Sequence, residues 1–312
     1  MKILHIDNNH PTLIQGLRDL GWENVENFTD SKNQIEKVIH LFDGLVVRSR
    51  FPIDTSFLKK AKRLKFIARV GAGMENIDLD QARVQGIHLF SAPEGNATAV
   101  AEHALGMLLS LTNHIPRANQ QVKSGIWLRE QNRGNEISGK TVGIIGYGNM
   151  GKAFASVLSG LNVEVIFYDI LDHIEDTNAR QVSLKDLQNR TDILSLHTPE
   201  TEKTIGMVNS AFINQFSKPF WLINTARGKA VVTEDLVEAL KKGQIKGAAL
   251  DVLDFEKSSF ETLFQNNNFP EAFSYLTQSD RVILSPHIAG WTFESHQKLA
   301  QVLLFKIKAI FT

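Results

Sequence analysis

Side chains that could do chemistry follow four apolar segments in the second half of the chain. His197, Arg227, Asp251 and His287 each come soon after one of these segments ends, and Glu256 stands five positions beyond Asp251. If the segments are parallel strands, their carboxyl ends meet at one edge of a sheet, and these side chains gather there. A guanidinium can bind a carboxylate through two hydrogen bonds, and an imidazole can take a hydroxyl proton while a hydride leaves the same carbon. The set therefore indicates a hydride-transfer site.

A carboxylate near such an imidazole would orient the ring and favour its protonated form. Spacing alone nevertheless leaves other interpretations open. Arg227 could belong to a surface ion pair, and His287 could be a hydrogen-bonded loop histidine without a catalytic role. Arg48 and Arg50 follow another apolar segment and could equally be solvated loop cations.

The elements that must position these residues include a glycine-rich loop. A short apolar run leads into Gly146-Tyr-Gly148-Asn-Met-Gly151, a helical pattern follows, and a second apolar run ends in Asp169. This order of strand, glycine loop, helix, strand and acid is typical of a dinucleotide-binding βαβ unit. Gly146 permits the turn, Gly148 lets a pyrophosphate approach the backbone, and Gly151 lets the helix pack on the strand. Asp169 is placed to accept hydrogen bonds from the adenine ribose.

Composition and charge restrict the class of protein. The chain has 312 residues, with 34 basic and 34 acidic side chains and no cysteine, so disulfides are excluded. The length suggests two domains, and the balanced charge does not indicate a nucleic-acid partner. The N-terminus is too polar for a secretory signal, and the most apolar helical segment, near residues 99–112, is too short to span a bilayer. The sequence therefore predicts a cytoplasmic protein without a membrane or nucleic-acid partner.

Strand and helix patterns alternate along the chain, which predicts an α/β fold with parallel, doubly wound sheets. The predicted strands are residues 2–7, 44–47, 64–70, 87–90, 142–145, 163–168, 192–196, 220–224, 246–250 and 281–284. The predicted helices are residues 11–20, 78–86, 96–112, 233–242 and 292–311, and residues 114–139 look like an irregular connection. The last helix is expected to pack on the first domain.

Several motifs along the chain form one recognisable set. They are Arg48-Ser-Arg50, Gly71–Asp78, Asn96–Glu102, Gly146–Gly151, His197-Thr-Pro199, Asn224–Gly228, Ala249–Val252 and Ser285–Gly290. Together they resemble the D-isomer-specific 2-hydroxyacid dehydrogenase family, most of all its D-3-phosphoglycerate dehydrogenase branch. The resemblance implies a Rossmann NAD-binding domain, residues 102–288, inserted in a flavodoxin-like substrate domain, residues 1–101 plus 289–312. It also implies a homodimer.

The resemblance implies a role for each candidate residue. Arg227 would bind the 2-oxo acid, His287 would be the catalytic acid/base, and Glu256 would support His287. The substrate residues would be Arg48, Arg50, Gly71, Ala72, Gly73 and Asn96, with the two arginines offering cations to a substrate phosphate. The cofactor-binding residues would be Gly146, Tyr147, Gly148, Asn149, Met150, Gly151, Asp169, His197, Thr198, Pro199, Thr225, Ala226, Arg227, Asp251, His287 and Gly290. No metal ligands are expected.

The chain departs from the usual family pattern at several positions. Lys257 stands where proline usually follows the catalytic glutamate, and Phe51 replaces a small polar residue. The stretch before His287 is longer than usual and contains Phe260–Pro270, which could alter the wall of the site. No C-terminal regulatory domain is expected after Thr312.

The expected reaction is hydride transfer between NAD and a D-2-hydroxy acid or 2-oxo acid. The favoured pair is 3-phosphoglycerate and 3-phosphohydroxypyruvate, as in serine biosynthesis. A hydroxypyruvate/glyoxylate or D-lactate reductase of the same family is the alternative. A non-catalytic, NAD-sensing binding protein, like the corepressors on this fold, is disfavoured by the intact catalytic set.

Overall fold

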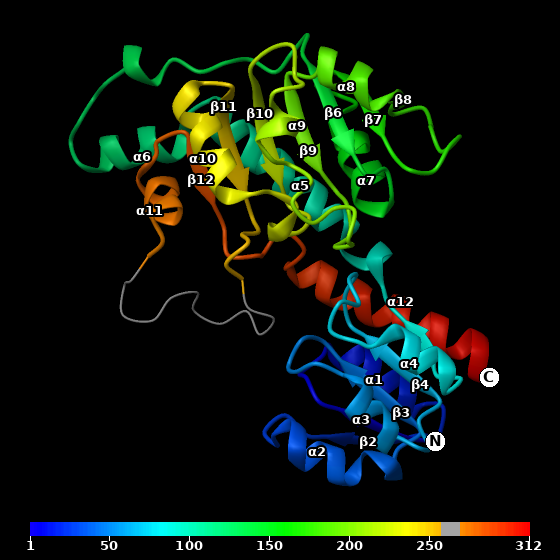
Figure 1. Cartoon of the computed structure of the whole chain (residues 1–312). Helices are drawn as coiled ribbons and strands as arrows, with labels where there is room; N and C mark the ends of the chain where they lie inside the picture. The colour runs from blue at the N-terminus through cyan, green and yellow to red at the C-terminus, as the bar shows by residue number, and fades with distance from the viewer. Residues whose placement is uncertain (257–268) are drawn as a thin grey trace. The chain divides into compact units, whose positions relative to one another are not determined.

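The structure is a computed structural model that describes residues 1–256 and 269–312. The described chain divides into two compact units (Figure 1). Unit 1 contains Met1–Ala97 and Trp291–Thr312, and unit 2 contains Thr98–Glu256 and the described residues up to Gly290. Lys257 and residues 260–268 of the Phe260–Pro270 stretch lie outside the described residues, so the expectations about them stay predictions.

Unit 1 is built on a five-stranded parallel sheet. Its strands are β1 (Lys2–His5), β2 (Glu23–Glu26), β3 (Gly44–Val47), β4 (Phe66–Arg69) and β5 (His88–Phe90). They lie in the order β2-β1-β3-β4-β5, which is the flavodoxin-like order of a doubly wound sheet. The helices between them are α1 (Pro11–Arg18), α2 (Lys32–Val38), α3 (Thr55–Lys60) and α4 (Leu79–Val84). Ile3 and Leu4 pack in different apolar clusters, because successive strand residues point to opposite faces of the sheet.

The C-terminal helix α12 (Phe293–Phe311) contributes to the core of unit 1. Its buried Leu303 packs in the same cluster as Leu13 of α1. Gly16 allows α1 to approach this helix closely, since a Cβ at that position would lie 2.1 Å from a methyl carbon of Leu304. The end of the chain thus completes the fold formed by its beginning.

Unit 2 is built on a seven-stranded parallel sheet. Its strands are β6 (Thr141–Ile145), β7 (Glu164–Tyr168), β8 (Arg180–Gln181), β9 (Ile193–Leu196), β10 (Phe220–Asn224), β11 (Ile245–Leu250) and β12 (Val282–Leu284). The order β12-β11-β10-β9-β6-β7-β8 reverses direction between β6 and β9, so the switch point of this Rossmann sheet lies beside the glycine loop (Figure 1).

Helices cover both faces of the second sheet. They are α5 (Pro93–Thr112), which carries the chain from unit 1 into unit 2, α7 (Asn149–Leu158), α8 (Leu184–Arg190), α9 (Ser210–Ile213), α10 (Thr233–Lys242) and α11 (Glu271–Gln278). Leu108 of α5 and Leu158 of α7 share one apolar cluster, and Leu187 of α8 and Leu240 of α10 share the other. The expected α/β fold with two doubly wound parallel sheets is therefore confirmed.

The structure differs from the expected elements where the sequence is polar. Residues 114–139 were expected to be irregular, but they contain helix α6 (Ile115–Lys123) and a short 3-10 turn, Glu130–Asn132. Helix α6 has only three apolar residues at helical spacing, Ile115, Ala118 and Val122, and none of its residues is buried, so its signal was weak. The short strands β2 and β8 also escaped prediction, because their residues are largely polar and at most half-buried.

Candidate active site

The glycine loop follows β6 and leads directly into α7. Gly146 has φ +90°, in the region that residues with a Cβ rarely adopt. A Cβ on Gly151 would lie 2.2 Å from the carbonyl oxygen of Gly146, so only glycine allows this contact between helix and turn. A Cβ on Gly148 would meet nothing within 4 Å, which leaves open space in front of the backbone there. Asn149 begins α7, whose free N–H groups can bind a phosphate.

Asp169 follows β7 and is bound to the same loop. Its carboxylate accepts the backbone N–H of Tyr147 at 2.7 Å and that of Leu171 at 3.0 Å. A carboxylate has about four lone-pair sites, so these two bonds fix its orientation and leave acceptors for ribose hydroxyls.

Three polar side-chain atoms beyond β9 and β10 are buried and have no hydrogen-bond partner among the described residues. The atoms are Nδ1 of His197, Oγ1 of Thr198 and Oγ1 of Thr225. Burial lowers the pKa of His197 to about 3, so the ring is neutral near pH 7, and its Nε2 lies 2.9 Å from Oγ of Ser195. Buried polar atoms normally have partners, and these atoms lie at the strand ends where dinucleotides bind. They fit the polar groups of such a cofactor.

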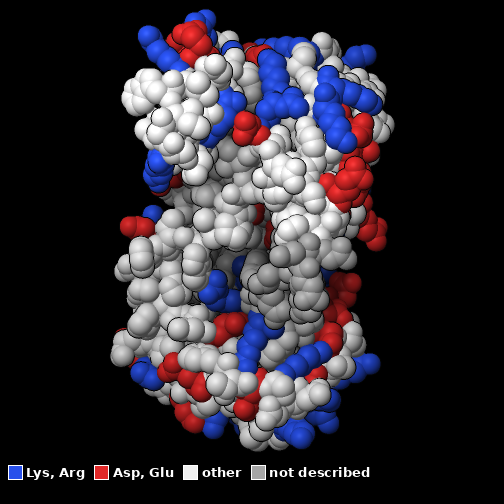
Figure 2. Space-filling model, turned by 90° about the vertical axis from the view of Figure 1, so that its left-hand side faces the viewer, with Lys and Arg blue, Asp and Glu red and all other residues white. Residues whose placement is uncertain are grey.

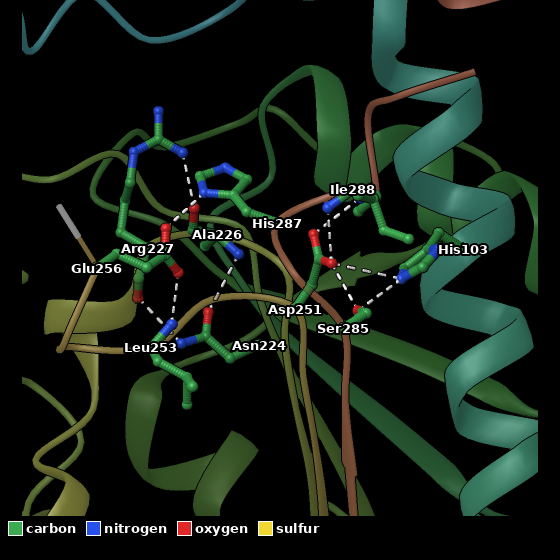
Figure 3. A network of polar contacts seen from close by, with 11 residues as sticks. His103, Asn224, Ala226, Arg227, Asp251, Leu253, Glu256, Ser285, His287 and Ile288 are labelled. Atoms are coloured by element: carbon green, nitrogen blue, oxygen red, sulfur yellow. Dashed lines mark hydrogen bonds and ion pairs between the residues drawn. The ribbon is translucent and has the colours of Figure 1, made fainter. Parts of the chain in front are cut away.

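The predicted catalytic residues lie after β10, β11 and β12 (Figure 3). Nδ1 of His287 is 2.6 Å from Oε2 of Glu256, and both side chains are partly exposed, at 31% and 23%. Oε1 of Glu256 accepts the backbone N–H of Leu253 at 2.6 Å, so the carboxylate is held from both oxygens. Gly228, next to Arg227, lies so close to this segment that a Cβ would be 2.0 Å from the carbonyl oxygen of Leu253.

The side chain of Asn224 fixes the loop that carries Arg227 through two hydrogen bonds to its backbone. The Asn224 side chain accepts the N–H of Ala226 at 3.1 Å and donates to the carbonyl oxygen of Arg227 at 2.9 Å. Nη1 of Arg227 donates to the carbonyl oxygen of Ala226 at 2.6 Å. The guanidinium has five N–H donors in a planar fork, a shape that can bind a carboxylate through two parallel hydrogen bonds.

Asp251 organises the backbone that carries His287. Its buried carboxylate accepts the N–H groups of Ile288 at 2.9 Å and Ala289 at 2.8 Å, and the hydroxyl of Ser285 at 2.5 Å (Figure 3). Its backbone carbonyl accepts the N–H of His287 at 2.8 Å. His287 has φ +56°, which is disfavoured for a residue with a Cβ, and these bonds stabilise that conformation.

His103 on α5 extends this network, and sequence reasoning assigned it no role. Its Nε2 lies 3.0 Å from Oγ of Ser285 and 3.6 Å from Oδ1 of Asp251. His103 sits in an apolar helical pattern, and no local motif connects it with residues 148 to 182 positions later in the chain. Only the sheet topology brings them together.

The remaining predicted cofactor residues also occupy strand ends or the glycine loop. Met150 is in the first turn of α7, Pro199 follows β9 and Gly290 follows β12. Within unit 2, the structure thus places all the predicted cofactor and catalytic residues in the segments that follow the carboxyl ends of β6, β7, β9, β10, β11 and β12.

The predicted substrate residues belong to unit 1. Gly71, Ala72 and Gly73 form the loop after β4, and a Cβ on Gly71 would lie 1.4 Å from Nη1 of Arg69. Oδ1 of Asn96, in the first turns of α5, is buried and has no partner among the described residues. These positions follow strands or begin a helix, where a polar ligand can bind.

Arg48 and Arg50 have different surroundings. The Arg48 guanidinium lies 4.1 Å from the centre of the Trp291 ring, and burial lowers the pKa of Arg48. The Arg50 guanidinium instead donates to three backbone carbonyls, those of Ile6 at 2.9 Å, Asn27 at 2.8 Å and Asp30 at 2.5 Å. Arg50 therefore connects loops of unit 1. This structural role was not part of the prediction that Arg50 is a second phosphate ligand.

Comparisons with known proteins agree with this geometry. Residues 105–289 match the family model described as D-isomer specific 2-hydroxyacid dehydrogenase, NAD binding domain. The chain is 34% identical over 305 residues to D-3-phosphoglycerate dehydrogenase of Haemophilus influenzae, covering 96% of this chain and 72% of that protein. It is 34% identical over 276 residues to hydroxypyruvate reductase of Thermotoga maritima, covering 88% and 87%. It spans only 56% of D-3-phosphoglycerate dehydrogenase of Archaeoglobus fulgidus, at 31% identity.

A solved structure has the same fold over nearly the whole chain. D-lactate dehydrogenase from Aquifex aeolicus, complexed with NAD and lactic acid, superimposes with a TM-score of 0.83 at 26% identity, covering 99% of this chain and 95% of that one. In residues 1–256 and 269–312, no group of three or more His, Cys, Asp or Glu side chains could hold a metal ion. The matched domain identifies NAD as the cofactor. The chain therefore belongs to the D-isomer specific 2-hydroxyacid dehydrogenase family of NAD-dependent oxidoreductases.

Proposed function

We propose that Arg227, Glu256 and His287 catalyse hydride transfer between NAD and a D-2-hydroxy acid. The observation that carries this assignment is the 2.6 Å contact between Nδ1 of His287 and Glu256. With Nδ1 bound to the carboxylate, Nε2 is the ring nitrogen that exchanges a proton with the substrate oxygen. Arg227 binds the substrate carboxylate, and NAD supplies the hydride acceptor or donor.

The substrate that we propose is 3-phosphohydroxypyruvate in the reductive direction and 3-phosphoglycerate in the oxidative one, as in serine biosynthesis. Several relatives at 31–34% identity carry the name D-3-phosphoglycerate dehydrogenase. Arg48 supports this choice, because its guanidinium makes no hydrogen bond to another residue within 1–256 and 269–312. Its stacking on Trp291 fixes the cation while leaving its N–H donors for a phosphate.

One observation favours an unphosphorylated substrate as the second candidate. Because Arg50 donates to backbone carbonyls, Arg48 is the one of the two predicted arginines whose guanidinium is left for a phosphate. Hydroxypyruvate, glyoxylate or pyruvate needs no such cation, and relatives named hydroxypyruvate reductase and glyoxylate reductase match the chain at 34% identity.

A steady-state screen of 2-oxo acids with NADH distinguishes these candidates. We expect kcat/KM to be highest for 3-phosphohydroxypyruvate, with hydroxypyruvate, glyoxylate and pyruvate well below it. Equal or higher values for hydroxypyruvate or glyoxylate would support the second candidate. No turnover of any of the four acids would contradict the proposed dehydrogenase.

The same assay tests the preference for NAD over NADP. The Asp169 carboxylate, fixed by two backbone bonds, would repel the 2′-phosphate of NADP, and Ile170 and Leu171 offer no cation to neutralise it. We expect kcat/KM to be higher with NADH than with NADPH. Equal values for the two cofactors would contradict this role of Asp169.

We also propose that the protein is a homodimer through unit 2. Most apolar side chains of α5 pack in their own unit, while Leu105 and Leu109 are only partly buried and could take part in the contact. Apolar side chains in and after α6 are exposed, including Ile115 at 51%, Val122 at 52% and Trp127 at 81%. Such clusters often mark protein interfaces. Sedimentation at micromolar concentration should show a dimer that Trp127→Ser weakens, and a monomeric wild-type protein would contradict the proposal.

Composition and charge support a proposal about the cellular setting. No helix in the described part of the chain is long and apolar enough to cross a membrane. Basic and acidic side chains both occur across the face shown in Figure 2, in keeping with the formal net charge of +0. We propose a cytoplasmic enzyme whose partners are small acids rather than nucleic acids or membranes.

A further inference from the structure

Tyr147 lies inside the glycine loop, but its side chain points into the protein. The residue is 1% exposed, and its ring stacks on Phe167 of β7 with ring centres 3.8 Å apart and planes 9° from parallel. Its hydroxyl donates to Oδ1 of Asp176 at 2.8 Å. Burial, together with Asp176, raises the pKa of Tyr147, so the hydroxyl stays protonated and remains a donor.

Tyr147 holds the segment after β7 at two points. Its backbone N–H donates to Asp169 at the start of the segment, and its hydroxyl donates to Asp176, seven positions later. The same oxygen of Asp176 accepts the N–H of Asn178 at 2.8 Å, which closes the turn before β8. One residue of the phosphate loop therefore fixes both ends of the segment that begins with the ribose-binding acid.

The middle of this segment has few internal contacts. Ile170 and Leu171 are 76% and 60% exposed. Gln181 of β8 donates to the carbonyl oxygen of Leu171 at 2.6 Å, and Asp169 accepts the Leu171 N–H. With so little burial, the segment depends on the bonds at its ends for a defined conformation.

We propose that Tyr147 is a positioning residue for the adenosine half of NAD. It acts through the hydrogen bond from its hydroxyl to Asp176. By fixing residues 169–176 before the cofactor arrives, the bond lowers the conformational entropy that binding would otherwise cost. Tyr147 touches no reacting atom in this role, so it affects cofactor affinity and not the hydride-transfer step. Binding of the adenosine half at this segment does not involve the acid substrate.

Binding of ADP-ribose tests the proposal, because this molecule contains the adenosine half of NAD and lacks the nicotinamide. Tyr147→Phe keeps the ring and its stacking and removes only the hydroxyl. We expect it to raise the Kd of both ADP-ribose and NADH by roughly three- to tenfold, the scale of one hydrogen bond.

Variants of Asp176 separate the hydrogen bond from general effects. Asp176→Ala should weaken ADP-ribose binding as much as Tyr147→Phe, and the double variant should be no weaker than either. Asp176→Asn keeps an oxygen that accepts from Tyr147, so its Kd should stay near the wild-type value. Tyr275→Phe is the matched control, because it removes a hydroxyl that accepts a bond from Arg281 at 3.1 Å elsewhere in unit 2.

An unchanged ADP-ribose Kd in Tyr147→Phe, or equal Kd values for Asp176→Asn and Asp176→Ala, would overturn the inference. Thermal melting of each variant shows whether it is folded, and the two Asp176 variants keep the test valid if Tyr147→Phe is not. Because ADP-ribose binding needs no acid substrate, failure here leaves the proposed dehydrogenase reaction untouched.

Discussion

The strand ends of the two units use their charged side chains differently. In unit 2, the polar side chains after β11 and β12 bind one another: His287 contacts Glu256, and Ser285 links His103 with Asp251. In unit 1, the cations after β3 are bound mainly by backbone and aromatic groups. Arg50 donates to three carbonyls, and the Arg48 guanidinium lies over Trp291.

This difference separates side chains that can take part in the reaction from side chains that stabilise the fold. An acid/base must be held in one tautomer and orientation, which requires a side-chain partner such as Glu256. A cation that binds a substrate anion needs free N–H donors and a fixed position, which stacking provides without using them. A cation that donates three hydrogen bonds to backbone carbonyls, like that of Arg50, contributes to the fold. The contrast leads to three predictions, in order of decreasing effect.

Removing the acid/base should have the largest effect. We expect His287→Gln to lower kcat by about 10²–10⁴-fold, the usual contribution of general acid–base catalysis. NADH binding should be nearly unchanged, as measured by fluorescence titration. His40→Gln, at an exposed position of unit 1, is the matched control and should keep wild-type kcat. Near-wild-type kcat in His287→Gln would show that His287 is not the acid/base.

The two arginines of unit 1 should differ in what they change. Arg50→Ala should lower the free energy of unfolding by about 2–3 kcal/mol, because it leaves backbone carbonyls without a charged donor. Arg48→Ala should change stability less and should raise KM for 3-phosphohydroxypyruvate more than KM for hydroxypyruvate. Urea denaturation and steady-state kinetics measure these effects. Equal increases of KM for the two acids in Arg48→Ala would show that Arg48 does not bind a phosphate.

Acidification should destabilise unit 2 through His197. Burial holds the pKa of His197 at about 3, below its ordinary value of 6.5, so the unfolded chain takes up the proton first. Stability is therefore lost as pH falls below 6.5, and we expect a loss of about 2 kcal/mol from this residue between pH 7 and pH 5. His197→Gln should flatten the dependence of unfolding free energy on pH. An unchanged pH dependence in that variant would contradict the buried, neutral state of His197.

The sequence predicted the features that depend on local pattern. The glycine loop follows a strand and begins a helix, and Asp169 ends the next strand, as the spacing indicated. Strand ends also indicated where His197, Arg227 and His287 would lie, because parallel strands place them at one edge of the sheet. Residue types at strand ends therefore contain most of the information about the candidate site in unit 2.

What the sequence did not predict depends on contacts between distant segments. The guanidinium of Arg50 reaches carbonyls 20 to 44 positions earlier in the chain, and nothing in its own motif indicates this. The link from His103 to Ser285 spans 182 positions. Helix α6 was missed for another reason: Ile115, Ala118 and Val122 do recur at helical spacing, but the segment is short and mostly polar, and none of its residues is buried.

The central claim is that Glu256 and His287 act as one acid–base unit, and a double-variant cycle of kcat for 2-oxo acid reduction tests it most directly. Glu256 holds the His287 ring through Nδ1 at 2.6 Å, so its effect on the reaction depends on the ring being present. Glu256→Gln alone should therefore lower kcat, by less than His287→Gln does. In the His287→Gln background, Glu256→Gln should cause no further loss of kcat, because residues that act as one unit have non-additive effects. Losses of kcat that multiply in the double variant would contradict the claim.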